Sequence, residues 1–298
     1  MGAVLFCFKP LLMKRVFSLL FISLFFVACQ KETTAVDQSL PEQNLADASY
    51  GTDAAQRMDI YLPAGRTTAA TKAIIIVHGG AWISGDKTEM NQFIPVIKKE
   101  LPDYAVFNIN YRLGALPTTN PFPTQENDVK AAVDFIVNKS SDYKFNTGKV
   151  VLLGASAGGQ LALLQAYKQT APKVKAVVSL FGPTDIPALY NFYPAGSVSQ
   201  LALQLLLGGS PTGNAGLYQS SSPINFVTAQ TPPTLLLHGT ADDIVPVAQS
   251  TALKTKLETA GVYVKMVSYP NAGHGDWNDA TFANAYSEIV SFLTAKNP

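Results

Sequence analysis

The sequence is short of the residues that build metal clusters, and it has no excess of either charge. Its 2 cysteines and 3 histidines are too few and too widely spaced for the Cys/His clusters of a zinc site. Its 22 lysines and arginines balance its 21 aspartates and glutamates, which argues against a nucleic-acid-binding protein. No repeat of about 20 to 50 residues is visible, so a solenoid or a propeller is not expected. We expect no metal, no other cofactor and no nucleic-acid partner.

The apolar run near the N-terminus is also too short to span a membrane. It extends over residues 16–28, fewer than the roughly 20 residues of a spanning helix, and Lys14 and Arg15 precede it. The junction Phe26-Val27-Ala28-Cys29 resembles a bacterial lipobox, in which the cysteine is lipidated and becomes the mature N-terminus. We therefore expect residues 1–29 to be an export signal and Cys29 to carry a lipid. That lipid would anchor the protein in the cell envelope, at the outer membrane on its periplasmic or surface side.

Phe26 stands where a lipobox usually has leucine, so cleavage without lipidation and a retained anchor stay open. Met13 is a better start than Met1, because the first residues would otherwise place a second apolar stretch ahead of the charges. Residues 30–48 are polar and show no periodicity, which predicts a flexible tether. The remaining residues, 49–298, form the predicted folded domain.

With 47% hydrophobic residues, the chain can bury the core of one sizeable α/β domain. Stretches typical of strands alternate with stretches typical of helices, which predicts a mostly parallel, doubly wound sheet with its chemistry at the carboxyl ends of the strands. Residues 55–63 alternate as an antiparallel strand near the sheet edge would. The alternation stops between residues 184 and 231, where one short apolar helix is expected at 201–207. This segment is either an excursion over the site that shapes substrate selection or an ordinary surface crossover.

The strongest chemical signal is Gly154-Ala155-Ser156-Ala157-Gly158. An apolar, partly β-branched run over residues 150–153 precedes it, and good helix formers follow it over residues 160–166. A strand, a tight turn and a helix are the context in which Gly-x-Ser-x-Gly forms a nucleophile elbow. The alternative is a plain turn between a strand and a helix. We predict that Ser156 is a nucleophile near a helix N-terminus, flanked by glycines small enough for the strand and the helix to pass closely.

A second signal is His78-Gly79-Gly80-Ala81-Trp82, which follows a β-branched strand at 72–77. Ester hydrolysis passes through a tetrahedral oxyanion, and rigid backbone N–H groups that face it lower the barrier. We expect these groups to be the amides of Gly80, Ala81 and Ala157. The alternative is a Gly-Gly turn with Trp82 buried as core. His78 is expected to brace the loop.

A serine hydroxyl needs a histidine to take its proton, and that histidine needs a carboxylate to hold its tautomer. His274 lies between two glycines in a loop and has little packing reason to exist, so it is the better base. The segment that begins at His238 resembles the His-Gly-x-x-Asp-x-x-Val-Pro pattern of serine hydrolases, which selects Asp242, with Asp243 as the alternative. A solvated Asp-Asp turn is the structural alternative for both. The order Ser156, Asp242, His274 is the order of the α/β-hydrolase fold.

These motifs resemble, as a set, those of the α/β-hydrolase esterases. The nearest branch is the bacterial feruloyl/acetyl-esterase-like (BD-FAE-like) group, related to hormone-sensitive-lipase-type carboxylesterases. The likeness extends from about residue 49 to the end and rests on His78–Trp82, Gly85-Asp86-Lys87, Asn110-Tyr111-Arg112, Gly154–Gly158 and the Asp242 and His274 loops. One departure is Ala81, where lipase-type members usually have a third glycine; its backbone N–H remains.

The resemblance implies a serine carboxylesterase that removes short acyl or feruloyl groups from carbohydrate or from small esters. Two other functions stay open. The same triad on this fold serves prolyl-oligopeptidase-like peptidases, but those generally carry a large propeller domain, which the short predicted tether cannot supply. A non-catalytic binding module would have no need to keep a complete triad and an oxyanion loop.

Overall fold

The computed structural model describes residues 40–115 and 119–298. The predicted export signal, Cys29 and most of the predicted tether lie outside the described residues. Within the described ranges, no helix is both long enough and apolar enough to cross a membrane.

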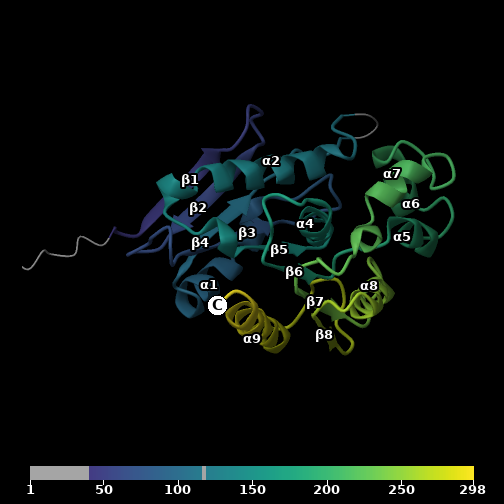
Figure 1. Cartoon of the computed structure of the whole chain (residues 1–298). Helices are drawn as coiled ribbons and strands as arrows, with labels where there is room; N and C mark the ends of the chain where they lie inside the picture. The colour runs from purple at the N-terminus through teal and green to yellow at the C-terminus, as the bar shows by residue number, and fades with distance from the viewer. Residues whose placement is uncertain (1–39, 116–118) are drawn as a thin grey trace, which may run out of the picture. The chain divides into compact units, whose positions relative to one another are not determined.

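One 8-stranded sheet organises residues 40–298, in the order β1-β2-β4-β3-β5-β6-β7-β8 (Figure 1). The strands from β3 onward are parallel, and β1 and β2 are antiparallel additions at one edge. This confirms the predicted doubly wound α/β-hydrolase architecture. The strands are β1 (Gln43–Ser49), β2 (Arg57–Leu62), β3 (Lys72–Val77), β4 (Tyr104–Ile109), β5 (Val150–Ala155), β6 (Ala176–Leu180), β7 (Thr234–Gly239) and β8 (Val264–Tyr269).

Strand β1 corrects the predicted domain boundary. We expected residues 30–48 to be a tether, but Gln43–Ser49 pairs with β2 over the register Gln43↔Leu62 to Ser49↔Arg57. The strand is mostly exposed and polar, so it has no hydrophobic alternation by which the sequence could reveal it. Its backbone pairing with the antiparallel edge is what orders it.

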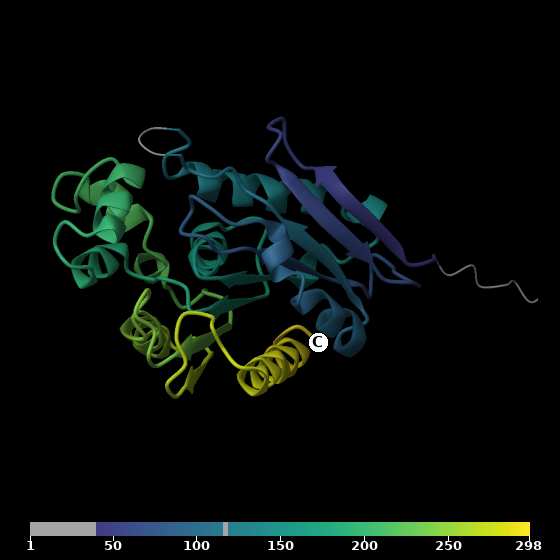
Figure 2. The same cartoon turned by 180° about the vertical axis from the view of Figure 1, so that it is seen from behind.

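The central strands are buried on both faces, and alternate side chains enter two separate cores. Ile75 of β3 packs with α2 and α4, whereas Ile74 and Ile76 pack with α1 and α9. Figure 1 shows α2 and α4 together on one side of the sheet and α1 and α9 together on the other, and Figure 2 shows the same layers from behind. The helices of these layers are α1 (Phe93–Glu100), α2 (Thr124–Asn138), α4 (Ala157–Lys168), α8 (Ala248–Thr259) and α9 (Asp279–Lys296), with the short α3 (Ser140–Tyr143) after α2.

The segment between β6 and β7 holds more helix than expected. In place of one helix at 201–207 it forms α5 (Ile186–Phe192), α6 (Val198–Leu206), α7 (Ala215–Ser220) and the 3-10 turn η3 (Pro223–Phe226). Polar caps explain the starts of two helices, because Asp185 accepts from the amide of Ala188 and Ser197 from that of Gln200. This bundle, which we call the excursion (residues 184–231), lies beyond α4 at one end of the sheet (Figure 1).

Candidate active site

Ser156 sits at a strained turn between β5 and α4. Its backbone has φ 53° and ψ −123°, an unfavourable conformation for a residue with a side chain, and α4 begins at the next residue. A Cβ on Gly158 would lie 2.2 Å from the carbonyl oxygen of Val77, and one on Gly154 would lie 2.2 Å from that of Gly158. The two glycines therefore let strand and helix approach, as the sequence predicts.

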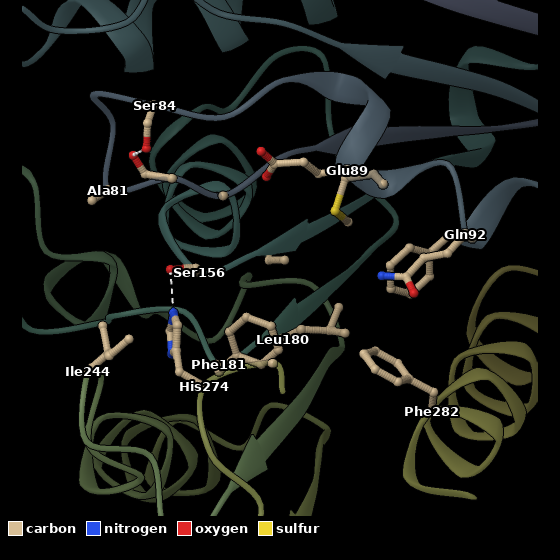
Figure 3. A pocket seen from close by; sticks show the side chains of 16 residues that line it. Ala81, Ser84, Glu89, Gln92, Ser156, Leu180, Phe181, Ile244, His274 and Phe282 are labelled. Atoms are coloured by element: carbon tan, nitrogen blue, oxygen red, sulfur yellow. Dashed lines mark hydrogen bonds between the residues drawn. The ribbon is translucent and has the colours of Figure 1, made fainter. Parts of the chain in front are cut away.

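The structure brings the three predicted side chains, from loops far apart in the sequence, into one chain of contacts. The Nε2 atom of His274 lies 2.8 Å from Oγ of Ser156 (Figure 3), and its Nδ1 atom lies 2.8 Å from Oδ2 of Asp242. This is the spacing that proton transfer from a hydroxyl to an imidazole requires. The alternative carboxylate, Asp243, is exposed, and among the residues the structure describes its side chain forms no hydrogen bond or ion pair.

Asp242 is buried, and both oxygens of its carboxylate lie next to hydrogen-bond donors. Its Oδ1 atom accepts hydrogen bonds from the amides of Ile244 (3.0 Å) and Val245 (2.8 Å). Burial alone would raise the pKa of Asp242, but contacts with His238 and His274 and the Val245 amide outweigh it and hold that pKa well below its usual range. The carboxylate is therefore an anion near neutral pH. The contact with His238, at 3.2 Å between Nε2 and Oδ2, was not anticipated from the sequence.

The loop after β3 takes the form expected of an oxyanion loop. Gly80, Ala81 and Trp82 all have positive φ (101°, 51° and 65°), so the backbone turns sharply at the strand end. Within the described ranges, the amides of Gly80, Ala81 and Ala157 have no recorded hydrogen-bond acceptor. Gly80 and Ala81 line the same pocket as Ser156, so their free N–H groups are available to a ligand there. Trp82 is buried, as the alternative interpretation held, and its Nε1 donates to Gln160.

His78 braces this loop, as predicted. It is fully buried, its ring stacks on Tyr111 with centroids 4.3 Å apart, and its Nδ1 lies 2.8 Å from the carbonyl oxygen of Gly79. The Tyr111 hydroxyl donates to the same carbonyl at 2.9 Å. Burial lowers the pKa of His78 to about 4, so its ring is neutral at pH 7.

Polar residues of the motifs that follow His78–Trp82 stabilise the next turn of the chain by hydrogen bonds. Asp86 accepts from the side chain of Asn110 (2.7 Å), and Asn110 accepts from the amide of Lys87 (2.6 Å). Arg112 holds the buried carboxylate of Asp128 through two guanidinium nitrogens at 2.9 and 2.6 Å. Asp86 and Asn110 therefore support the turn after the oxyanion loop, whereas Arg112 joins the segment after β4 to α2.

A pocket of about 370 Å³ opens beside Ser156. In Figure 3, Ala81, Ser84 and Glu89 lie on one side of it and Leu180, Phe181 and His274 on the other, with Gln92 and Phe282 farther along. The walls come from the oxyanion loop, the 3-10 helix η1 (Lys87–Met90), the start of α1, the end of β6, and α9. The lining residues are Gly79, Gly80, Ala81, Ser84, Glu89, Met90, Gln92, Phe93, Ala155, Ser156, Leu180, Phe181, Ile244, His274, Gly275 and Phe282.

None of these residues belongs to the excursion, which contradicts, for this cavity, the interpretation that residues 184–231 shape the pocket and leaves the alternative of a surface crossover. The excursion does contact residues that surround the site: the Tyr193 hydroxyl donates to the carbonyl oxygen of Ile244 at 3.0 Å, and Ile186, Leu203 and Leu206 line a small cavity together with Trp82 of the oxyanion loop. The apolar wall residues were missed by sequence reasoning. The one available signal was their position just after strand ends or at helix starts, as for Phe181 after β6.

No group of three or more His, Cys, Asp or Glu side chains within residues 40–115 and 119–298 is arranged to hold a metal ion. What the arrangement offers is a serine hydroxyl in contact with an imidazole, a buried carboxylate behind that imidazole, and free amides at the pocket. These groups suit acyl transfer.

The comparisons with known proteins agree with this geometry. The family model BD-FAE matches residues 58–257. Among curated proteins, the chain is similar to the esterase LipQ of Mycobacterium tuberculosis, with 28% identity over 67% of this chain and 49% of the relative. It is also similar to the isoprenylcysteine alpha-carbonyl methylesterase ICME of Arabidopsis thaliana, with 25% identity over 76% of this chain and 55% of the relative. The chain thus spans about half the length of the curated relatives it matches.

Among solved structures, one similar protein is a truncated form of a carbohydrate esterase from gut microbiota. The TM-score is 0.75 at 26% identity, and the match covers 86% of this chain and 96% of that one. Another is a bifunctional GH43-CE protein of Bacteroides eggerthii, with a TM-score of 0.74, 27% identity, and coverage of 86% of this chain and 38% of that one.

Proposed function

The chain belongs to the BD-FAE family of α/β-hydrolase esterases, and on that premise we propose that it hydrolyses carboxylic esters with Ser156 as nucleophile, His274 as base and Asp242 as the carboxylate that orients His274. The observation that carries the proposal is the pair of 2.8 Å contacts that His274 makes with Ser156 and Asp242. These contacts give each ring nitrogen of His274 a role in the proposed reaction. Nδ1 donates to the carboxylate, which leaves Nε2 free to accept the serine proton.

The chemistry proceeds in two halves. Oγ of Ser156 attacks the ester carbonyl while its proton passes to Nε2 of His274, and the carbonyl oxygen becomes an oxyanion facing the amides of Gly80, Ala81 and Ala157. His274 then gives the proton to the leaving alcohol, and an acyl-serine remains. Water repeats the attack with His274 as base, which releases the acid and restores the serine hydroxyl.

We infer that the substrates are small acyl esters, including short acyl or feruloyl groups on carbohydrate. A pocket of about 370 Å³ suits an acyl group of modest size, and most of its wall is apolar and aromatic. The similar carbohydrate esterase structure supports a sugar as the alcohol.

The experiment is hydrolysis of p-nitrophenyl esters from acetate to decanoate, then of acetyl-xylan and methyl ferulate, by wild type and Ser156→Ala. Activity that favours short chains and is lost in the variant is expected. Unchanged activity in Ser156→Ala would refute the nucleophile. A folded protein that turns over no ester would favour the peptidase or binding functions.

We further propose that the protein is exported and anchored through a lipid on Cys29. The sequence pattern Phe26–Cys29 after a basic, apolar leader supports this. Metabolic labelling with a radioactive fatty acid should mark the wild type but not Cys29→Ala. Equal labelling of both would refute lipidation at this residue.

A further inference from the structure

Asp242 faces two histidines, only one of which the proposed reaction uses. Its Oδ2 atom lies 2.8 Å from Nδ1 of His274 and 3.2 Å from Nε2 of His238. The side chains of Asp242 and His238 are both 0% exposed. His238 comes from β7 and reaches the carboxylate from within the protein, whereas His274 lies toward the pocket.

The partners of His238 determine its tautomer. Its Nε2 atom is near two groups that can only accept a hydrogen bond, the Val245 carbonyl oxygen at 2.8 Å and the ionised Asp242 carboxylate. Nε2 must therefore carry a proton. Its Nδ1 atom lies 2.7 Å from Oγ of Ser250, which donates to Nδ1 when the ring is neutral. The ring thus ties the start of α8 to the loop that holds Asp242.

That loop is also joined to the loop that carries His274. The amide of Ala241 donates to the carbonyl oxygen of Ala272 at 3.0 Å, and the amide of Asn271 donates to the Thr240 side chain at 3.0 Å. A Cβ on Gly239 would lie 2.2 Å from the Ala272 carbonyl oxygen, so the two backbones are in close contact. Backbone contacts thus fix the loops, and the amides of Ile244 and Val245 hold Oδ1 of Asp242. The other carboxylate oxygen, Oδ2, faces the side chains of His238 and His274 instead.

We infer that His238 is a positioning residue for the reaction: its Nε2–H, shared between Val245 and Asp242, holds Oδ2 of Asp242 on the line to His274. The inference rests on the triad proposed above. A purely structural histidine would be satisfied by Ser250 and Val245 alone, yet this ring also approaches the one carboxylate oxygen that contacts His274. An outer partner of this kind orients the inner group and tunes its basicity.

The test compares two substitutions at His238 by kcat and KM on p-nitrophenyl acetate. His238→Met keeps the bulk but has no donor, and we expect kcat to fall about tenfold to a hundredfold, the loss typical when an outer partner is removed. KM should stay unchanged. His238→Gln carries an amide N–H near the position of Nε2, and it should restore most of kcat.

A double-mutant cycle separates positioning from general damage. In an Asp242→Asn background, His238→Met should cause little further loss of kcat, because its target is already removed. Leu257→Ala, a fully buried change farther along α8, is the control: it should lower the melting temperature without lowering kcat of the folded protein. If His238→Met does not fold, Ser250→Ala keeps the ring but removes the hydrogen-bond partner of its Nδ1, which loosens the ring's orientation, and it should lower kcat with KM unchanged.

A folded His238→Met with wild-type kcat, or losses that add in the Asp242→Asn background, would overturn the inference. So would a His238→Gln variant as slow as His238→Met, or a Ser250→Ala variant with wild-type kcat where His238→Met does not fold. Failure of the triad itself has a different signature, since wild type and Ser156→Ala would then hydrolyse the ester at equal rates.

Discussion

Two regions at the carboxyl ends of the strands contrast sharply. The loops that carry the proposed triad, here called the catalytic loops (residues 154–158, 238–245 and 271–276), contain a buried carboxylate and a serine with positive φ. The excursion (184–231) has one charged residue, Asp185, and no other charge follows until Asp242. On its surface Val198 is 86% exposed, Leu201 46% and Leu205 44%. The comparison shows that this protein separates a strained site, rich in hydrogen bonds, from a helical bundle with a single charged residue and exposed apolar side chains.

The largest expected effect lies in the catalytic loops. His274→Ala should lower kcat by about 10⁶, the size of loss seen when the base of such a triad is removed. The melting temperature should change little, because His274 is only partly buried and lies in a loop. Steady-state kinetics and calorimetry on the same preparation measure kcat and the melting temperature. A loss of less than about tenfold would show that His274 is not the base.

The same substitution, glycine to alanine, should have opposite effects in the two regions. Gly158→Ala places a Cβ 2.2 Å from the Val77 carbonyl oxygen and 2.3 Å from that of His78, so it should destabilise the protein by about 3 kcal/mol, the upper end of the usual cost of overpacking, and reduce activity. Gly216 in α7 has nothing within 4 Å of its added Cβ, so Gly216→Ala should stabilise by about 0.5–1 kcal/mol with kcat unchanged. Urea unfolding measures both. If both substitutions lowered the free energy of unfolding equally, the contrast between the two regions would be contradicted.

The pH dependence of stability should come from the strand-end region around the site. His78 has its pKa lowered to about 4 by burial, from an ordinary 6.5, so between these values the unfolded chain binds more protons than the folded one. Stability should therefore fall as pH decreases from about 6.5 to 4, by at most about 3 kcal/mol. The depressed pKa of Asp242 adds a loss only below about pH 4, once the unfolded carboxylate is protonated. The urea concentration at the midpoint of unfolding, measured at pH 7, 5.5 and 4, checks this. In His78→Asn, stability should change less between pH 7 and pH 4.

The smallest effect is expected on the surface of the excursion. Leu201→Ser and Leu205→Ser replace half-exposed side chains that do not line the pocket, so stability should change by no more than about 0.5 kcal/mol each. Hydrolysis of a soluble short ester should be unaffected. A large fall in kcat for either variant would show that the excursion takes part in the site after all.

Much of the site could be predicted because each motif is local. The elbow is a strand, a serine between small residues, and a helix, and each part follows from neighbouring residues, as at Gly154–Gly158. The order Ser156, Asp242, His274 then indicates the α/β-hydrolase fold. Strand β1 escaped prediction because its exposed residues carry no periodic signal. Whether residues 184–231 lie over the site stayed open, because the sequence shows that the alternation of strands and helices stops there but not where the segment packs.

The sequence by itself therefore determined the parallel sheet and led to the proposal of the elbow, the oxyanion loop and the triad Ser156, Asp242 and His274, since hydrophobic periodicity and turn chemistry act over a few residues. Only the tertiary structure decided what surrounds them. The pocket wall unites η1, α1 and α9, and the second contact on Asp242 comes from His238, which the sequence left without a role at the site. Such contacts form between helices and loops that are far apart in the sequence but cover the same face of the sheet. No local sequence pattern predicts them.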